Sequence, residues 1–262
     1  MPFVRLQRKD VIEPFLRRNA YLHVYALGDL DDFFWPHTTW YGLEEENQLQ
    51  AILLLYTALE VPTLMALGDP PYHPLCRLLS LAQPVLPPRM HAHLSAGCRE
   101  ILGHTHRFET RGPHWKMALL KPALDVPGVE RVERLTLDDG AELKELYTAG
   151  YPANWFHARQ IEIGYYGLRE RGKLICAAGA HVYSSTQRVA ALGNIVTHPD
   201  HRGRGHAAAV TARICKELFR TVDHIGLNVK ADNASAVACY RRLGFEPVAE
   251  YEEVMLTRHD SP

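Results

Sequence analysis

Glycine and arginine residues follow an apolar, β-branched run in the second half of the chain. The run ends at Pro199, the turn reads Arg202-Gly203-Arg204-Gly205, and the alanine-rich segment that begins at Gly205 has the composition of a helix. The free N–H groups of a helix's first turn and the positive end of its dipole attract phosphate, and glycine allows close approach to the backbone. The pattern therefore predicts a strand, an anion-binding loop and a helix, with a diphosphate as ligand.

This turn differs from two common nucleotide-binding loops. It lacks the Lys-Ser/Thr ending of a P-loop, and Ala208 stands where a dinucleotide-binding fingerprint needs its third glycine. A solvated turn between a strand and a helix is one alternative interpretation. A nucleic-acid contact through Arg202 and Arg204 is another, but the charge near zero and the lack of a basic stripe with interleaved aromatic residues weigh against it.

A second strand and helix follow downstream. Leu227-Asn228-Val229-Lys230 has the composition of a short buried strand, and a helix over 234–243 follows Asn233, with Gly244 as its C-cap. Together the two patterns resemble the GNAT superfamily of acyl-CoA-dependent N-acyltransferases over roughly the second half of the chain. The family signature Q/R-x-x-G-x-G/A reads Arg202-Gly203-Arg204-Gly205-His206-Ala207. The later pattern N-x-x-A-x-x-x-Y reads Asn233, Ala236 and Tyr240, followed by Leu243-Gly244-Phe245.

The resemblance implies a role for each matching position. Loop N–H groups would hold the pyrophosphate of acetyl-CoA or another acyl-CoA, and main-chain groups of the strand before the loop would pair with the pantetheine arm and polarise the thioester. Tyr240 matches the general acid; packing inside a helix is its structural alternative. Asn233 matches a pantetheine contact and also fits a helix N-cap. The expected cofactor-binding residues are Ile195, Val196, Thr197, Arg202, Gly203, Arg204, Gly205, His206, Ala207, Asn228, Asn233 and Ala236, and the expected catalytic residues are Tyr240 and Asn194.

The general base is not evident from the sequence. Many family members place a glutamate on the strand before the loop, but residues 189–197 contain no carboxylate. Asn194 can orient an amine or a water molecule but cannot take a proton. His181, His198 and Glu162 are candidate bases, each with a structural role as the alternative. A base acting through water, or an amine that arrives neutral, would need none of them.

The predicted function is transfer of an acetyl or other acyl group from acyl-CoA to a primary amine of a small molecule, amino acid or peptide. The first half of the chain contains the loop Gly68-Asp69-Pro70-Pro71 where the second has its glycine and arginine loop. Proline supplies no N–H and aspartate repels phosphate, so this half is not expected to bind the cofactor. A degenerate half before an intact one resembles the glycine N-acyltransferase branch. The alternative is a catalytically silent acyl-CoA-binding regulatory module.

Length and composition favour two domains. The chain has 262 residues, 47% of them apolar, and a formal charge of −1, which gives no bulk attraction to nucleic acid or anionic membranes. The first ten residues lack a signal layout, and no apolar run approaches the ~20 residues of a membrane helix. Five scattered cysteines and two histidine pairs, His91/His93 and His104/His106, lack a completed metal-ligand spacing. A cytoplasmic protein without metal is predicted, with a homodimer as one option.

The predicted fold class is α/β, with a GNAT-like mixed central sheet flanked by helices in two tandem copies. The domains are placed at 1–121 and 131–262, with a linker at 122–130. The aromatic-rich stretch Tyr151–Phe156 is expected to be a loop near the acceptor. Helices are predicted at 10–19, 21–30, 70–82, 141–147, 160–164, 205–219 and 234–243, and strands at 38–43, 48–56, 63–67, 89–94, 114–120, 132–135, 165–170, 174–183, 189–197, 225–229 and 250–256.

Overall fold

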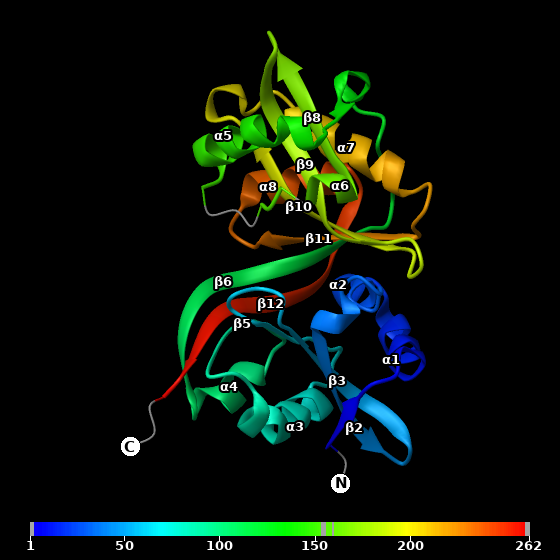
Figure 1. The fold of residues 1–262 in the computed structure, drawn as a ribbon, viewed down its shortest axis with the longest axis vertical. Coiled ribbons are helices and arrows are strands. Elements are labelled where there is room, and N and C mark those ends of the chain that lie inside the picture. The colour runs from blue at the N-terminus through cyan, green and yellow to red at the C-terminus, as the bar shows by residue number, and fades with distance from the viewer. Residues whose placement is uncertain (1–2, 153–155, 159, 260–262) are drawn as a thin grey trace. The chain divides into compact units, whose positions relative to one another are not determined.

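The computed structural model describes residues 3–152, 156–158 and 160–259 (Figure 1). The chain forms two compact units, and its C-terminal segments are divided between them. The first unit contains Met1–Lys116, Lys230–Asp232 and Val248–Pro262, and the second contains Met117–Val229 and Asn233–Pro247. The long strands β6 and β12 each run from one unit into the other. The tandem domains predicted at 1–121 and 131–262 stay a prediction, because compactness divides the chain at other residues.

The first unit is a mixed sheet with helices. Its strand order is β1-β2-β3-β4-β5-β12-β6. The β4–β5 pair is parallel, and the β1–β2, β2–β3, β3–β4 and β5–β12 pairs are antiparallel. The elements that begin in this unit are β1 (Phe3–Leu6), α1 (Lys9–Leu16), α2 (Val24–Gly28), β2 (Thr38–Glu45), β3 (Gln48–Tyr56), β4 (Thr63–Ala66), α3 (His73–Ala82), β5 (Arg89–Leu94), α4 (Cys98–Gly103) and β6 (His106–Leu119).

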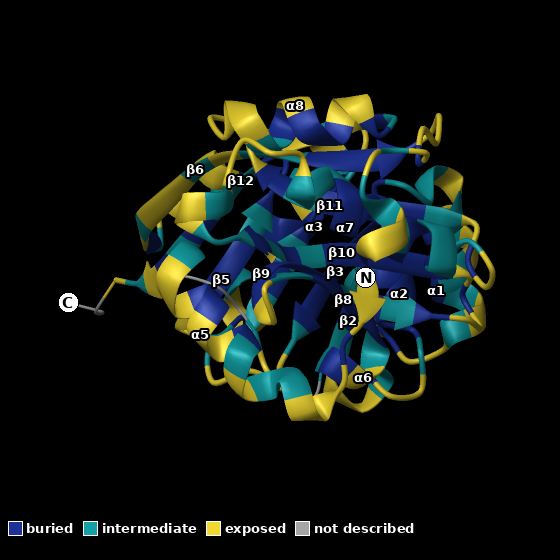
Figure 2. Ribbon diagram, turned by 90° about the horizontal axis from the view of Figure 1, so that it is seen from above, coloured by how far each residue is buried: buried dark blue, intermediate teal, exposed yellow. Residues whose placement is uncertain are grey.

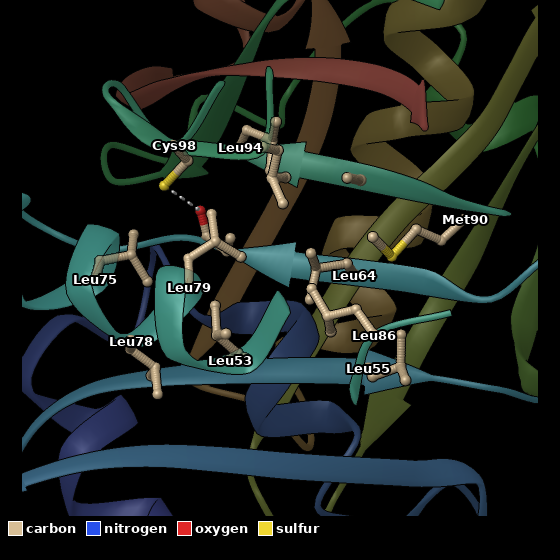
Figure 3. Packing of buried hydrophobic residues seen from close by; sticks show 14 of the residues in the cluster. Leu53, Leu55, Leu64, Leu75, Leu78, Leu79, Leu86, Met90, Leu94 and Cys98 are labelled. Carbon is tan, nitrogen blue, oxygen red and sulfur yellow. Dashed lines mark hydrogen bonds between the residues drawn. The ribbon is translucent and has the colours of Figure 1, made fainter. Parts of the chain in front are cut away.

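A leucine-rich cluster forms the core of this unit. Leu75, Leu78 and Leu79 recur at helical spacing on α3, so they occupy one face of the helix and pack against the sheet (Figure 3). From the strands, Leu53 and Leu64 meet them; all five side chains are at least 96% buried. Burial of this apolar surface, worth about 25 cal/mol per Å², fixes α3 on the sheet.

The second unit has the strand order β12-β6-β11-β10-β9-β8-β7, with β10 and β11 parallel. The elements that begin in this unit are β7 (Glu133–Arg134), α5 (Gly140–Gly150), α6 (Gln160–Gly164), β8 (Tyr165–Glu170), β9 (Lys173–Ser184), β10 (Val189–Thr197), α7 (His206–Leu218), β11 (His224–Lys230), α8 (Ala234–Arg242) and β12 (Phe245–Arg258). In each unit a mixed sheet is flanked by helices, so the predicted α/β class is confirmed.

Helix α7 shows why an alanine-rich sequence suits this place in the second unit. Ala209, Ala212 and Ile214 are fully or almost fully buried, since the small side chains let the helix lie close to the sheet. Figure 2 shows the exposed residues concentrated on the outer faces of the helices and on loops, with the strands largely buried.

Several sequence predictions need correction. Strand β1 and helix α4 were not expected, and β6 begins at His106 rather than at His114. His104 precedes β6, so the pair His104/His106 does not lie on a single strand. The expected strand at 132–135 is shorter, as β7 covers Glu133–Arg134 only. The predicted loop Tyr151–Phe156 includes residues 153–155, which lie outside the described residues.

Candidate functional site

The two parallel strands of the second unit diverge. Pairing of β10 with β11 runs from Val189 opposite His224 to Leu192 opposite Leu227 and ends there, whereas both strands continue beyond it. Asn228 therefore lies one residue past the last pair. The main-chain groups of residues 195–197 are not used in pairing with β11, which agrees with the predicted separation of these strands.

The loop between β10 and α7 holds a row of unpaired N–H groups. Gly203 and Gly205 have φ angles of 76° and 82°, a region that favours glycine, and Gly205 is the N-cap of α7. The first bond into the helix is from Ala209 N–H to the Gly205 carbonyl. Within the described part of the chain, the N–H groups of residues 203–208 have no hydrogen-bond partner. A Cβ at either glycine would meet no atom within 4 Å, so the outer side of the loop is open.

Arg202 is used differently from the glycines. Its own N–H donates to the Pro199 carbonyl, and its guanidinium donates to the carbonyls of Thr197 (3.3 Å) and Gly150 (2.8 Å). The side chain thus ties the end of β10 to the end of α5. Arg204 donates to the Asp200 carbonyl at 3.2 Å and lies 4.0 Å from the Glu170 carboxylate. The unpaired donors of the loop therefore begin at Gly203 rather than at Arg202.

A polar network fixes the strand residue Asn194 beside the divergence. The Asn194 main-chain carbonyl accepts from the Tyr147 hydroxyl at 2.6 Å, and its Nδ2 donates to the Tyr165 hydroxyl (3.0 Å) and to the side-chain oxygen Oε1 of Gln160 (3.3 Å). Burial raises the pKa of Tyr165 to about 12 and the pKa of Tyr147 well above its usual value, so both phenols stay neutral hydrogen-bonding groups. Phe156 stacks on Tyr147 with a centroid separation of 4.9 Å.

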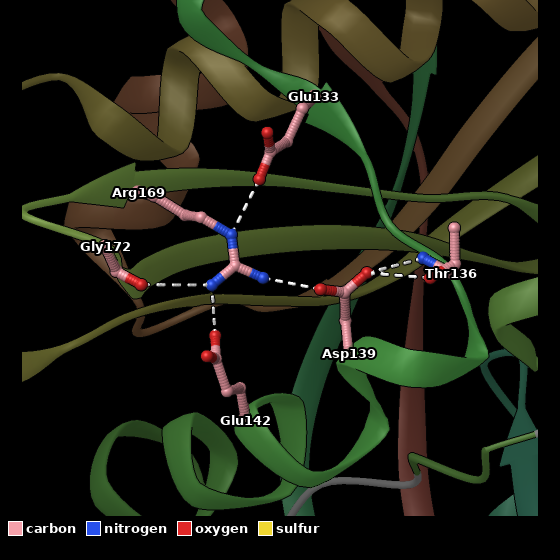
Figure 4. Close-up of polar contacts among 6 residues, drawn as sticks. All are labelled: Glu133, Thr136, Asp139, Glu142, Arg169 and Gly172. Carbon is pink, nitrogen blue, oxygen red and sulfur yellow. Dashed lines mark hydrogen bonds and ion pairs between the residues drawn. The ribbon is translucent and has the colours of Figure 1, made fainter.

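An arginine clasp holds α5, the helix that carries Tyr147. Arg169 on β8 donates to Glu133 on β7 at 2.7 Å, to Asp139 and Glu142 at the start of α5, and to the Gly172 carbonyl of the β8–β9 turn at 3.3 Å (Figure 4). One planar guanidinium thus joins two strands, a turn and a helix, a role that suits arginine's fixed fork of donors.

The 3₁₀ turn Leu137–Asp139, which leads directly into α5, is capped at its own start. Thr136 and Asp139 form a capping box, in which the Asp139 carboxylate accepts from the Thr136 N–H at 2.7 Å. The same carboxylate accepts from Arg169, so the cap and the clasp share it (Figure 4). Both place α5, and hence the Tyr147 hydroxyl, against β10.

The residues of the second motif lie on α8. The Asn233 side chain accepts from the Ala236 N–H at 3.2 Å, so Asn233 is an N-cap, as one of its two interpretations predicted. Tyr240 is 8% exposed and packs edge-on against Phe245 at 5.9 Å. Gly244 has a φ of 93°, and a Cβ there would lie 1.7 Å from the Lys121 carbonyl oxygen, which explains the glycine of the Leu-Gly-Phe ending.

The three candidate bases occupy different places. Glu162 is exposed on the short helix α6. His198 Nδ1 accepts from the Asp200 N–H at 3.3 Å, which uses this nitrogen within the loop. His181 lies on β9 beside Asn194, and burial lowers its pKa while the Asn194 side chain raises it by a smaller amount.

Sequence reasoning missed three residues that fix Asn194: Tyr147, Gln160 and Tyr165. The signal available was weak, because each is one polar or aromatic residue within an ordinary amphipathic segment. A buried tyrosine hydroxyl needs a partner, so the usable signal was the tyrosine at the end of the predicted helix 141–147 and the one at the start of the predicted strand 165–170.

Other kinds of site are not seen. The described residues contain no group of three or more His, Cys, Asp or Glu side chains arranged to hold a metal ion. Over the same residues, none of the helices has both the length and the apolar character required to cross a bilayer.

Comparison with known proteins agrees with this geometry. Residues 130–245 match the acetyltransferase (GNAT) family. The match includes α5, the strands β7–β11, the loop and the helices α7 and α8, and it supports the resemblance drawn from the two motifs. A curated acetyltransferase of Sodalis glossinidius (strain morsitans) is 42% identical over 50 residues, which are 19% of this chain and 35% of that protein. The chain therefore spans about a third of the length of this relative.

Solved structures extend the GNAT-like fold to the whole chain. A Drosophila protein has a TM-score of 0.70 at 13% identity, with 98% of each chain covered. A GCN5-related N-acetyltransferase from Sphaerobacter thermophilus has a TM-score of 0.58 at 15% identity, covering 98% of this chain and 96% of that one. A tandem GNAT protein from the clavulanic acid biosynthesis pathway has a TM-score of 0.54 at 15% identity, with 99% of each covered. At these identities the likeness concerns the fold alone.

Proposed function

We propose that this protein is an acyl-CoA-dependent N-acyltransferase that transfers an acetyl or other acyl group to a primary amine. The observation that carries the proposal is the junction of β10 and α7. Two strands part at Leu192 and Leu227, and a glycine loop with unpaired N–H groups follows directly. Divergent strands offer main-chain partners to an amide-containing chain such as pantetheine. The loop and the positive end of α7 offer donors to its diphosphate.

The donors of the loop are assigned to the pyrophosphate. N–H groups of Gly203, Arg204, Gly205, His206 and Ala207 would hold it, and the Arg202 side chain would support the loop through its carbonyl contacts. Burial and the nearby His201 and arginine charges lower the pKa of His206, so at neutral pH this residue contributes its N–H rather than a charge.

The strand ends are assigned to the pantetheine arm and the thioester. Ile195, Val196 and Thr197 would pair with the pantetheine amides and polarise the thioester carbonyl through their N–H groups. Asn228 lies on the facing strand just past the last pair. Asn233 and Ala236 would line the arm from the start of α8, with Asn233 also capping that helix.

Tyr240 is assigned to the departing sulfur. Expulsion of a thiolate is easier when a general acid protonates it, and a neutral phenol can supply that proton. Tyr240 is buried on α8, where the phenol is shielded from bulk water. Asn194 is assigned to the amine because the network described above holds it at the divergence.

The acceptor would be an amine of a small molecule, an amino acid or a peptide. A degenerate first half before an acyl-CoA half is also the arrangement expected from the glycine N-acyltransferase branch, so longer acyl donors belong in the test. The cytoplasmic location and the homodimer stay predictions from the sequence.

Two measurements test the proposal. Calorimetric titration with acetyl-CoA, CoA and a longer acyl-CoA should give saturable binding at one site. Release of free thiol should then depend on an added amine. Absence of binding would overturn the acyl-CoA assignment, whereas binding without turnover on any amine would favour the silent regulatory module.

A further inference from the structure

Two β-bulges follow each other closely where β9 pairs with β10, one on each strand. Ala191 lies opposite Val182 and Leu192 opposite Ala180, so His181 is an extra residue on β9 without a partner. Two residues further along β10, after Gly193, the asymmetry reverses, since pairing passes from Gly193–Gly179 to Val196–Ala177. Bulges of this kind redirect side chains and occur often next to active sites.

The second bulge places two residues of β10 opposite one of β9. Asn194 and Ile195 together face Ala178, and Asn194 has a φ of 52°, an uncommon angle for a residue other than glycine. Asparagine is among the residues that tolerate this conformation best. The strained residue is thus the one that the tyrosine and glutamine network holds.

The first bulge directs the His181 imidazole across its neighbour strand. A Cβ at Gly193 would lie between 2.3 and 2.4 Å from the ring atoms Cε1, Nδ1 and Nε2. No side chain fits at position 193 while the ring is there. Glycine at position 193, directly before Asn194 in β10, therefore makes room for the His181 imidazole.

Two polar atoms of this pair are buried without a well-formed hydrogen bond to any described residue: His181 Nε2 and Asn194 Oδ1, although Asn194 is only 5% exposed. The two side chains lie close enough for Asn194 to raise the pKa of His181. Buried polar atoms are nearly always paired, so two adjacent ones indicate a ligand or a bound water molecule. Nε2 can accept a proton and Oδ1 can accept a hydrogen bond. A group rich in N–H donors fits both.

We propose that His181 Nε2 and Asn194 Oδ1 form the subsite of the acceptor amine, and that His181 is the residue that removes its proton. This inference rests on the proposed function, because it assigns the proton acceptor of the same reaction. It accounts for the absence of a carboxylate on β10: the base comes from a bulge in the neighbouring strand. Glu162 and His198 lack this placement, one being exposed and the other bonded within the loop.

The amine enters as an ammonium ion, gives one proton to His181 Nε2, and its freed lone pair forms the N–C bond to the thioester carbonyl carbon. The C–S bond breaks with its electron pair on sulfur, which takes a proton from Tyr240. The amide nitrogen loses its surplus proton, which restores the phenol, and the imidazolium releases its proton to solvent. Asn194 Oδ1 holds the amine in line and stabilises the imidazolium.

The test compares His181→Gln with wild-type protein. Glutamine keeps hydrogen-bonding capacity but cannot take a proton. With a panel of primary alkylamines at neutral pH, kcat should fall by a factor on the order of 10² to 10⁴, the range of a lost general base. Calorimetric affinity for acetyl-CoA should stay within about twofold. With aromatic amines, which are already neutral at this pH, the loss should be at least tenfold smaller.

A matched control is His106→Gln in the first unit. His106 is also buried with an unpaired Nε2, so this variant reproduces the loss of a buried histidine away from the site, and its turnover should be unchanged. A second variant, Asn194→Gly, tolerates the positive φ and should raise KM for the amine. Equal losses of turnover with alkyl and aromatic amines, or no loss, would overturn the inference. So would wild-type protein that binds acetyl-CoA but acylates no amine. Failure of acetyl-CoA binding itself would instead refute the proposed function.

Discussion

The loop after β10 in the second unit and the loop after β4 in the first occupy equivalent places in a parallel strand–helix–strand element. In both, the strand is followed by a glycine-containing turn and a helix, and the next strand runs parallel to the first. In the second unit, the N–H groups of the six successive residues 203–208 have no partner among the described residues. The first unit uses its polar groups internally.

The differences in the first unit are specific. The Gly68 N–H donates to the Ser95 hydroxyl at 3.1 Å, and the Ser95 N–H donates to the Ala66 carbonyl at 2.9 Å. Asp69 accepts from the Asn19 side chain at 2.7 Å. The next residues are Pro70 and Pro71, which have no N–H to offer. A shared topology therefore does not imply a shared anion site. The site depends on whether the backbone donors at the strand end are left unpaired.

The largest expected effect comes from closing the open loop. Gly205→Glu places a carboxylate at the N-terminus of α7, where it would compete with a diphosphate for the N–H groups and repel it. Juxtaposed like charges cost several kcal/mol, so affinity for acetyl-CoA should fall by about a hundredfold or more in calorimetric titration.

The control for this variant is Gly172→Glu in the β8–β9 turn. Gly172 has a nearly identical φ of 80° and, like Gly205, no atom within 4 Å of a built Cβ. Both variants carry the same backbone strain and the same charge, but only one lies at the loop. An equal loss of binding in both would mean that the loop is not the anion site.

The second effect concerns the first unit, whose core is the leucine cluster on α3. Leu79→Ala removes a fully buried side chain from the leucine cluster of α3 and should lower the free energy of unfolding by about 2–5 kcal/mol in denaturant titration. Leu81 on the same helix is 42% exposed, so Leu81→Ala should cost far less. Acetyl-CoA affinity of the folded Leu79→Ala protein should be unchanged, because α3 does not contribute to the loop between β10 and α7 whose N–H groups are assigned to the diphosphate. A marked loss of affinity would show that the two regions are not separable in this way.

The contrast also shows which features a sequence can reveal. Strand β10 and helix α6 were predicted end to end, because runs of apolar residues and the glycine turn mark local structure directly. Strand β1 was missed, since four residues pair with the distant β2, and long-range pairing leaves no local pattern. The first part of β6 was also missed, because its residues are mostly polar and do not alternate between apolar and polar as a half-buried strand does.

At the site, the loop was found from its glycines but its support was not. Arg202 was expected to present an N–H to phosphate, whereas its N–H and side chain bind protein carbonyls. The bulges at His181 and Asn194 depend on the register between strands, which no single strand encodes. Gly193 illustrates the limit, because its necessity becomes visible only when the imidazole lies over it.

A third prediction separates acetyl-CoA binding from catalysis in the second unit. Tyr240→Phe removes only the phenol oxygen, so packing against Phe245 should be kept, acetyl-CoA affinity should change little, and kcat should fall by a factor on the order of 10². Tyr166→Phe is the control, because Tyr166 is equally buried at 8% exposure but lies on β8. Equal turnover by both variants would remove the general-acid assignment.

The smallest expected effect comes from the clasp. Helix α5 of the second unit is held by polar contacts from Arg169 as well as by apolar packing. Helix α3 of the first unit is held by leucine packing. Arg169→Ala should lower the free energy of unfolding by about 1–2 kcal/mol, since a networked guanidinium with four partners contributes more than an isolated pair.

Arg188→Ala provides the comparison for the clasp. Arg188 and Asp223 form a pair in which both side chains are 53% exposed, so its loss should cost less than about 1 kcal/mol. Arg169→Ala should also lower turnover modestly, because α5 carries the Tyr147 hydroxyl that fixes the Asn194 backbone. Equal stability losses in the two variants would mean that the clasp behaves as an ordinary surface ion pair. The position of α5 would then be set by its apolar face, as that of α3 is.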